Sequence, residues 1–405
     1  MKTHIVWLRR ELRENHPAFQ NIPSTARVVA VYVWEDREKA SWLGIQRFGS
    51  HKEKFITESL NELQQTLAKQ NIELLITSGN TIKSLLAIVE RYKAEHIHWS
   101  TLPAYEEKRD EHELKQKLQK IPAQTHIYET YTLWSAKQVC ERINKPLRSF
   151  SQFRKRFEPL LEESFPAEPL QSVTDKYTTT ENIQFNGGRS HALNHLSAYL
   201  QQNGPVRHYK STRNGMLGMS YSSKLSPWLA WGNLGPEEAL RAVHQHETEF
   251  GKNESTHWLK IELLWREFFQ HLAVQAGPEL FYDGSPQIDY EPIVKGSFAE
   301  WVKGETNNDF VNANMKELNA TGFMSNRGRQ NVASALIYDL GEDWRKGACY
   351  FEQQLIDYDP ASNYGNWQYI AGLRANSRGG SWFNVNKQAQ MYDSDGSYRR
   401  HWLSL

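Results

Sequence analysis

Short apolar runs alternate with segments of helical periodicity over the first 130 residues. Residues 5–8, 28–33, 74–76, 97–99 and 127–128 are rich in β-branched and aromatic side chains, which is typical of buried strands. Between them, residues 55–69 and 81–92 carry apolar side chains at helical spacing. Strands that alternate with helices in this way predict a doubly wound parallel sheet, a Rossmann-like α/β domain.

The pattern changes twice after residue 130. Residues 131–190 lose the alternation and gain Pro, Thr, Ser and Glu, so we expect a linker on the surface. From residue 191 to 405 strand signals are scarce and the Gly and Pro turns are spaced for helices. The chain is therefore predicted to hold an α/β domain over 1–130, a linker over 131–190 and an all-helical domain over 191–405. The basic side chains of the linker favour a solvated face over a nucleic-acid patch; they are Arg148, Arg154, Lys155 and Arg156.

The first predicted domain has no dinucleotide fingerprint. Arg9 to Arg13 follow the first strand where a G-x-G-x-x-G turn would stand, so we expect no dinucleotide in this domain. His96 and His98 flank Ile97 at strand alternation. They could form a metal pair, but solvent-facing strand positions are the favoured interpretation.

Composition excludes several classes of protein. A net charge of +1 argues against a surface coated in positive charge and leaves room for a local basic groove. Cys140 and Cys349 are too few for an iron–sulfur cluster or a structural zinc site, so no metal is predicted and both thiols are read as inert. With no signal peptide and no run of about eighteen apolar residues, the sequence predicts a soluble, cytoplasmic protein.

A serine cluster marks the start of one predicted helix. Ser222, Ser223 and Ser226 surround Lys224, directly before Pro227 and an apolar run. Free backbone N–H groups and hydroxyls at a helix start attract phosphate. An ordinary N-cap in a serine-rich turn is an equally good interpretation of these residues alone.

A second candidate feature is a glutamate that lies between two tryptophans on a predicted helix. Trp258, Glu262 and Trp265 share one helical stripe with Phe269. Burying Glu262 unpaired would cost several kcal/mol, so it meets either a polar ligand or an arginine such as Arg266. Residues 321–329 add donors, and residues 355–369 add two carboxylates, an asparagine and aromatics. Together these groups suit a large cofactor with a diphosphate.

These segments resemble the photolyase/cryptochrome family, most closely its DASH branch. Residues 7–13 are similar to the family's opening W-F-R-x-D-L-R, and long matches cover residues 212–232, 255–269, 313–334 and 344–369. The resemblance runs over nearly the whole chain. It implies an antenna-type α/β domain followed by a helical domain that binds FAD folded into a U shape.

The resemblance assigns site residues position by position. The residues that would hold the FAD diphosphate are Tyr209, Ser222, Ser223, Lys224, Leu225 and Ser226. Those that would line the rest of the FAD site are Glu262, Arg266, Asn326, Arg329, Asp357, Asp359 and Asn363. An ion pair of Arg329 with Asp357 is expected against the isoalloxazine ring. The residues implied to act on the substrate are Glu262, Trp265, Asn326 and Tyr369.

The implied activity is that of a light-dependent lyase, a photolyase. Excited FADH⁻ would pass an electron to a cyclobutane pyrimidine dimer in DNA, chiefly in single strands, and the protein would act as a monomer. The rim of the cavity would be basic. The candidate contacts to DNA phosphates are Arg207, Lys210, Arg213, Arg327, Arg374 and Arg378. The alternative is a blue-light photoreceptor that signals through a protein partner. The chain ends directly after the FAD domain, which counts against a receptor.

Two further assignments rest on looser matches. Trp367 and Trp344 match the inner two tryptophans of the family's electron-transfer chain, and Tyr290 is the nearest candidate for the third. Glu106 lies in a segment that only loosely resembles the binding site of a folate antenna, methenyltetrahydrofolate. Folate binding is therefore left open.

Overall fold

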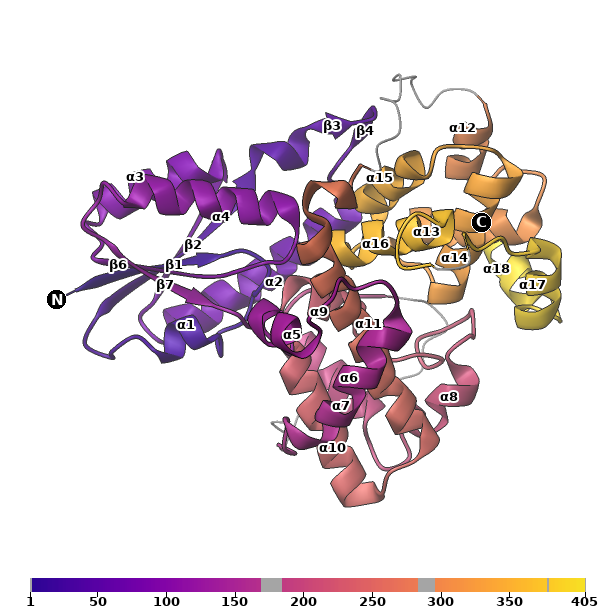
Figure 1. The fold of residues 1–405 in the computed structure, drawn as a ribbon, viewed down its shortest axis with the longest axis horizontal. Coiled ribbons are helices and arrows are strands. Elements are labelled where there is room, and N and C mark those ends of the chain that lie inside the picture. The colour runs from indigo at the N-terminus through magenta and orange to yellow at the C-terminus, as the bar shows by residue number, and fades with distance from the viewer. Residues whose placement is uncertain (1, 169–183, 283–295, 377–378, 405) are drawn as a thin grey trace.

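The computed structural model describes residues 2–168, 184–282, 296–376 and 379–404. An α/β part at one end adjoins a helical part at the other (Figure 1). All five predicted strands form one parallel sheet in the order β5-β2-β1-β6-β7, which confirms the predicted fold class. The strands are β1 (Thr3–Leu8), β2 (Arg27–Glu35), β5 (Glu73–Gly79), β6 (His96–Ser100) and β7 (Gln124–Tyr128).

Helices cover both faces of this sheet. Ile5, Trp7 and Val31 pack on the side of α3 (Thr81–Arg91) and α4 (Tyr105–Leu118). Val6 and Leu8 pack on the opposite side, with α1 (Pro17–Gln20) and α2 (Ser50–Ala68). Every residue of β1 is buried. Burial on both faces explains why the central strands read as continuous apolar runs rather than as alternating ones.

The remaining elements are short connections and the helical part. The connections are η1 (Asp36–Lys39), β3 (Ser41–Trp42), β4 (Ile45–Gln46), η2 (Pro205–His208), η3 (Gly277–Leu280) and the π-helix η4 (Ala335–Asp339). The helices are α5 (Ala136–Arg142), α6 (Phe150–Glu163), α7 (Arg189–Tyr199), α8 (Tyr209–Thr212), α9 (Ser226–Trp231), α10 (Pro236–Phe250), α11 (Glu254–Ala276), α12 (Ser297–Lys303), α13 (Asp309–Thr321), α14 (Asn326–Ser334), α15 (Trp344–Gln354), α16 (Pro360–Ala371), α17 (Val385–Tyr392) and α18 (Ser397–Leu403). Across the described ranges, each helix is too short or too polar to cross a membrane.

The predicted surface linker is wrong for much of its described length. Residues 136–142 and 150–163 are helical, and Phe153 and Phe157 of α6 are fully buried. α6 packs against α11 through Phe153 and Phe268. The polar composition of the segment hid the apolar spacing of α6, which is helical. The domain boundaries at 130 and 190 remain predictions.

The two parts meet where the chain leaves β1. Gly232 adopts φ +65°, and a Cβ there would lie 2.1 Å from the Arg10 carbonyl oxygen, so only glycine fits. The Leu12 N–H donates to the Trp231 carbonyl at 3.0 Å, and the Asn233 amide donates to the Leu12 carbonyl. Arg10 Nη1 donates to the Tyr358 carbonyl at 2.7 Å. The sheet therefore docks on the helical part through backbone contacts that tolerate little change.

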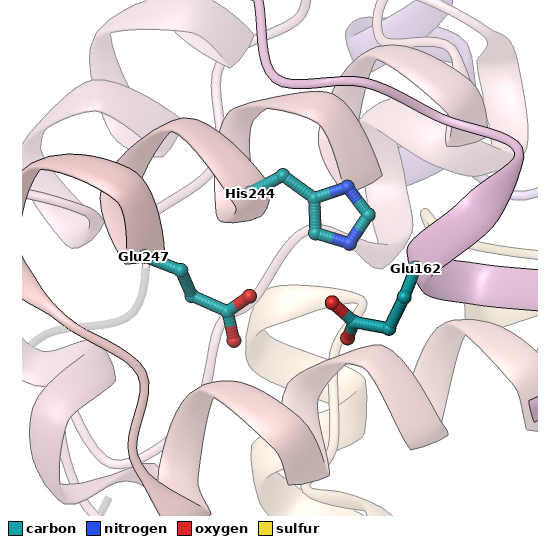
Figure 2. A group of neighbouring side chains, drawn as sticks. All are labelled: Glu162, His244 and Glu247. Carbon is teal, nitrogen blue, oxygen red and sulfur yellow. The ribbon is translucent and has the colours of Figure 1, made fainter. Parts of the chain in front are cut away.

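A buried lysine holds α11 to its neighbours. Lys260 is 2% exposed, and its Nζ pairs with Glu247 Oε2 at 2.8 Å and with Glu162. Figure 2 shows Glu162, Glu247 and His244 converging, with ligand atoms within 4.8 Å of one another. The Lys260 and Lys252 ammonium groups pair with the two carboxylates of this cluster, so we assign the cluster a structural role.

Lys260→Met should be strongly destabilising, because it leaves Glu247 buried without its cation. We expect the free energy of unfolding to fall by about 3–5 kcal/mol. The measurement is the urea midpoint followed by far-ultraviolet circular dichroism.

The matched control is Lys252→Met, since Lys252 also pairs with Glu162 but is 65% exposed. It should cost less than about 1 kcal/mol. Equal losses in the two variants would contradict the role given to Lys260.

Candidate active site

The main candidate site is a cavity of about 460 Å³ inside the helical part. Its wall draws on α8, the loop before α9, α11, α14 and α16, which are far apart in sequence. The sequence-predicted residues on this wall are Tyr209, Ser222, Ser223, Lys224, Leu225, Ser226, Glu262, Trp265, Arg266, Asn326, Arg329, Asp357 and Tyr369. The fold thus brings nearly all of the predicted site residues to one space.

The serine segment forms one side of the cavity. α9 begins at Ser226 and Pro227 follows, as predicted. The loop before it is fixed by His195, whose ring nitrogen Nε2 lies 2.7 Å from the Ser223 carbonyl oxygen. The hydroxyl side chains of Ser222, Ser223 and Ser226 all line the cavity. They supply the small donors that a phosphate needs.

Lys224 behaves differently from these serines. Its Nζ lies 3.4 Å from the centre of the Tyr221 ring and 4.5 Å from that of Phe323. Burial lowers its pKa well below the usual value of a lysine. Lys224 therefore brings no ordinary ammonium charge to the wall, and the other cations that line the cavity are Arg213, Arg266, Arg327 and Arg329.

The predicted ion pair of Arg329 with Asp357 is present. Arg329 Nη2 lies 2.8 Å from Asp357 Oδ2, and Arg329 Nε donates to the Met324 carbonyl at 2.9 Å. The second oxygen of Asp357, Oδ1, is buried and has no hydrogen-bond partner among the described residues. A buried carboxylate oxygen without a donor is costly, and it is typical of an atom that accepts from a ligand.

Asp359 is satisfied within the protein. Its carboxylate accepts from Tyr131 Oη and Gln270 Nε2, each at 2.8 Å, and from the Ser362 N–H at 2.7 Å, which caps α16. Burial alone would raise the pKa of Asp359, but the Arg10 and Arg266 charges and these hydrogen bonds lower it. We therefore see Asp359 as a carboxylate that holds segments together.

A smaller cavity of about 100 Å³ adjoins the larger one and shares Asn326, Arg329 and Asp357 with it. Asp359 and Asn363 line this smaller space rather than the larger one. The Asn363 amide nitrogen donates to the Ala348 carbonyl at 2.9 Å. That bond fixes the direction of the Asn363 side chain.

Glu262 is paired with Arg213 across the cavity wall. Burial raises the pKa of Glu262, although the Arg213 charge opposes the shift. The sequence left open which arginine would pair with Glu262. Arg266 instead donates to the Tyr131 carbonyl at 2.8 Å. Arg213 was missed as the partner because helical periodicity relates only positions on the same helix.

The aromatic wall is built from three elements. Trp265 stacks flat on Phe150 of α6, with ring centres 3.6 Å apart and an interplanar angle of 10°. The Tyr369 ring stands edge-on to Trp265 at 6.4 Å. Phe150 was not predicted, because its segment was read as a linker. One face of Trp265 is thus covered, which fixes the ring against the cavity.

The basic rim is only partly as expected. Of the six predicted cations, Arg213 and Arg327 line the cavity, and Arg378 lies outside the described residues. Arg374 pairs with Glu279 at 2.7 Å. Lys210 and Arg213 lie 4.2 Å and 4.8 Å from the centre of the Trp258 ring, which also lines the cavity. Cations therefore gather around one tryptophan at this wall.

Of the predicted electron-transfer residues, Trp367 lies at the smaller cavity, and Trp344 packs edge-on against Tyr364. Trp367 lines that cavity and is buried. A Cβ on Gly347 would lie 2.2 Å from the Trp367 ring, so α15, which begins at Trp344, packs directly on it. Tyr290 lies outside the described residues.

The predicted antenna residue lies in a different place. Glu106 lines a cavity of about 80 Å³ between the sheet and the helical part. Both of its carboxylate oxygens accept from Arg47, at 3.0 Å and 2.6 Å, and Arg47 Nε also donates to Glu352 at 2.6 Å. Arg47 thus engages both oxygens of Glu106 in an ion-pair network between the sheet and α15, and the folate antenna stays a prediction.

Comparisons with known proteins agree with this architecture. Residues 4–171 match the family model "DNA photolyase", and residues 258–405 match "FAD binding domain of DNA photolyase". A cryptochrome DASH of Gloeobacter violaceus is 37% identical over 99% of this chain and 85% of its own length. A solved Synechocystis cryptochrome superposes with a TM-score of 0.90 at 36% identity, covering 100% of this chain and 89% of its own. A solved class III photolyase of Agrobacterium tumefaciens superposes with a TM-score of 0.82 at 27% identity. The match covers 100% of this chain and 87% of the photolyase chain.

The main cavity fits FAD, the cofactor of this domain. Its volume lies within the range of about 300–1,000 Å³ that is usual for cofactor sites. The serine hydroxyls and Arg213 suit a diphosphate, while Arg329 and the free Asp357 oxygen suit a polar heteroaromatic ring. Bound FAD would supply the light absorption and the electron transfer.

Asp357→Asn should weaken FAD binding by about tenfold to a hundredfold, because it removes both an anionic acceptor and the partner of Arg329. The measurement is the flavin released per chain on denaturation, read by absorbance after dialysis against flavin-free buffer.

Asp395→Asn is the control, since Asp395 lies on the surface near the C-terminus and accepts from Ser397. It should retain its flavin. If Asp357→Asn keeps as much flavin as this control, Asp357 does not hold the cofactor.

Proposed function

Because this chain belongs to the photolyase/cryptochrome family and carries its FAD-binding domain, we propose that it is a photolyase that repairs cyclobutane pyrimidine dimers in DNA, mainly in single strands. The observation that supports this most is the shared cavity. It combines a pocket for a flavin, at Arg329 and Asp357, with Glu262 and two aromatic side chains suited to two linked pyrimidine bases.

Glu262 would hydrogen-bond to the dimer or protonate it. Its pKa is raised by burial, so it holds a proton more readily than a surface glutamate does. Arg213 fixes the carboxylate on the wall through the ion pair. A carboxyl group that is oriented before the substrate arrives needs little reorganisation when charge develops on a lesion carbonyl.

Trp265 and Tyr369 would flank the lesion after it leaves the stack of bases. Trp265 is backed by Phe150, so it offers a rigid edge, and Tyr369 stands at right angles to it. Two adjacent bases must leave a duplex to reach such a cavity, and unpairing them costs a few kcal/mol. Tyrosine at position 369 gives less stacking than tryptophan to offset that cost, which supports a preference for single strands.

Glu262→Gln should lower the repair rate by about tenfold, which corresponds to about 1.4 kcal/mol, because the amide cannot donate a proton. Flavin content should stay the same. The measurement is loss of dimers from an irradiated oligothymidine under blue light, with chemically reduced protein, compared with the same lesion in a duplex.

The control is Glu254→Gln, which lies two turns before Glu262 on α11 and whose exposed side chain pairs with Lys210. It should repair at the wild-type rate. A flavin-loaded wild-type protein that repairs neither substrate would overturn the proposed function and favour a photoreceptor.

Trp367 and Trp344 would carry electrons to the flavin from the surface. Trp367→Phe should slow light-driven reduction of the oxidised flavin at least about tenfold, because phenylalanine is much harder to oxidise. Chemically reduced Trp367→Phe should still repair. The measurement is the bleaching of oxidised flavin under blue light with an external reductant.

Trp382→Phe is its control, since this tryptophan is 58% exposed and its indole N–H donates to Asp339 at 2.9 Å. Equal photoreduction in Trp367→Phe and Trp382→Phe would show that electrons take another route.

A further inference from the structure

Aromatic rings continue from Trp344 to the surface of the protein. Tyr364 of α16 stands edge-on to Trp344, with ring centres 6.4 Å apart and an interplanar angle of 79°. The same tyrosine ring lies 5.9 Å from that of Trp42 on β3. Trp344 and Tyr364 are buried, whereas Trp42 is half-buried and reaches solvent. The three rings therefore form a path from α15 to the surface, and Tyr290 is not needed for it.

The inner end of this path lies against the flavin cavity. Trp367 lines the smaller cavity, and a Cβ on Gly347 would lie 2.2 Å from the Trp367 ring. Gly347 and Trp344 are three residues apart on α15, so they lie on the same face of that helix. Trp344 is thus on the side of α15 that packs on Trp367. Four aromatic residues follow one another from the cavity to solvent, and the third of them is a tyrosine.

The hydroxyl of this tyrosine is bonded to a carboxylate. Tyr364 Oη donates to Glu352 Oε2 at 2.7 Å, and Glu352 Oε1 accepts from Arg47 Nε at 2.6 Å. A hydrogen bond from a hydroxyl to a carboxylate is among the stronger ones in proteins. Burial raises the pKa of Tyr364 well above the usual value of a tyrosine, so the resting phenol keeps its proton.

This arrangement suits a tyrosine that is oxidised and reduced in turn. A phenol that loses an electron becomes a strong acid, so its proton needs an acceptor at hydrogen-bond distance. The Glu352 carboxylate is such an acceptor. Because Tyr364 and Glu352 are both buried, the proton stays between them and can return when the electron is replaced.

A second aromatic branch leaves Trp367 but has no such acceptor. Trp301 stands edge-on to Trp367 at 6.3 Å, and Tyr350 stands edge-on to Trp301 at 5.9 Å. Tyr350 Oη donates to Asn319 Oδ1 at 2.5 Å. A side-chain amide accepts a hydrogen bond but does not take up a proton at neutral pH. The carboxylate therefore distinguishes the Tyr364 branch from the Tyr350 branch.

We propose that Tyr364 is the third electron donor on the path to the flavin, with Glu352 as its proton acceptor. Trp367 gives the first electron to the light-excited, oxidised flavin, and Trp344 replaces it. One electron then passes from Tyr364 to the Trp344 radical cation, while the Oη proton moves to Glu352. The products are neutral Trp344, a neutral tyrosyl radical and a protonated Glu352 carboxyl. A thiol reductant in solution, acting at Trp42, returns the electron, and the proton goes back to Tyr364.

This role rests on the proposed function, because it needs a bound flavin and the electron transfer proposed for Trp367 and Trp344. The test is electron paramagnetic resonance of the FAD-loaded full chain, oxidised and frozen under blue light. We expect a tyrosyl radical, whose spectrum narrows when the protein is grown with ring-deuterated tyrosine. Tyr364→Phe should lose this signal and show a tryptophan radical in its place. Its flavin content should stay the same.

The matched control is Tyr350→Phe, which removes one hydroxyl from a buried tyrosine of the other branch. It should keep the tyrosyl signal. Glu352→Gln is the second variant, read in place of Tyr364→Phe if circular dichroism shows that the latter is unfolded. It should also lose the signal, because an amide cannot take the proton.

A tyrosyl signal that survives in the folded Tyr364→Phe or Glu352→Gln variant overturns the proposal. So does a signal that is lost in Tyr350→Phe, or a flavin-loaded wild type that forms no tyrosyl radical. Repair is scored separately with chemically reduced protein, which does not need the path. Failure of the proposed repair function therefore shows in that assay, and failure of the Tyr364 route shows in the radical spectrum.

Discussion

The structure depends on the need to satisfy polar side chains that are buried along α11. Lys260 pairs with Glu247, Glu267 Oε2 accepts from the Leu133 N–H at 2.7 Å, and Gln270 donates to Asp359 at 2.8 Å. Each of these partners comes from a different segment. Because an unsatisfied buried polar group costs about 1–3 kcal/mol, the three bonds fix α11 against α10, the chain before α5 and α16. The helix that carries Glu262 is thereby held in place.

Asp357 and Asp359 lie two residues apart in the sequence but have different roles, one in the cavity and one in the fold. Asp359 has every oxygen bonded within the protein, so it serves the fold. Asp357 has one oxygen on Arg329, and its other oxygen has no hydrogen-bond partner among the described residues, as is typical of a group that binds a ligand. The same division applies to the arginines. Arg266 is tied to Tyr131, whereas Arg213 holds Glu262 on the cavity wall.

The two ends of the sheet have different chemistry. The carboxyl end meets the helical part at Gly232, where backbone contacts leave no room for a side chain. The small charged cavity beside this junction is lined by the Arg47 ion pairs with Glu106 and Glu352. The opposite end carries His4, His96, His98 and His126, whose rings stack across neighbouring strands. His98 is 2% exposed, so its predicted solvent-facing position is wrong.

The sequence by itself determined the five parallel strands and the helical second half, because apolar periodicity is a property of neighbouring positions. The residues of the flavin cavity followed from the resemblance of the sequence to the photolyase/cryptochrome family. Contacts between distant segments were decided only by the tertiary structure. The pairing of Glu262 with Arg213, the stacking of Phe150 on Trp265 and the burial of His98 each join separate elements. No local pattern specifies which helix or strand will supply a partner, since that depends on how the elements pack.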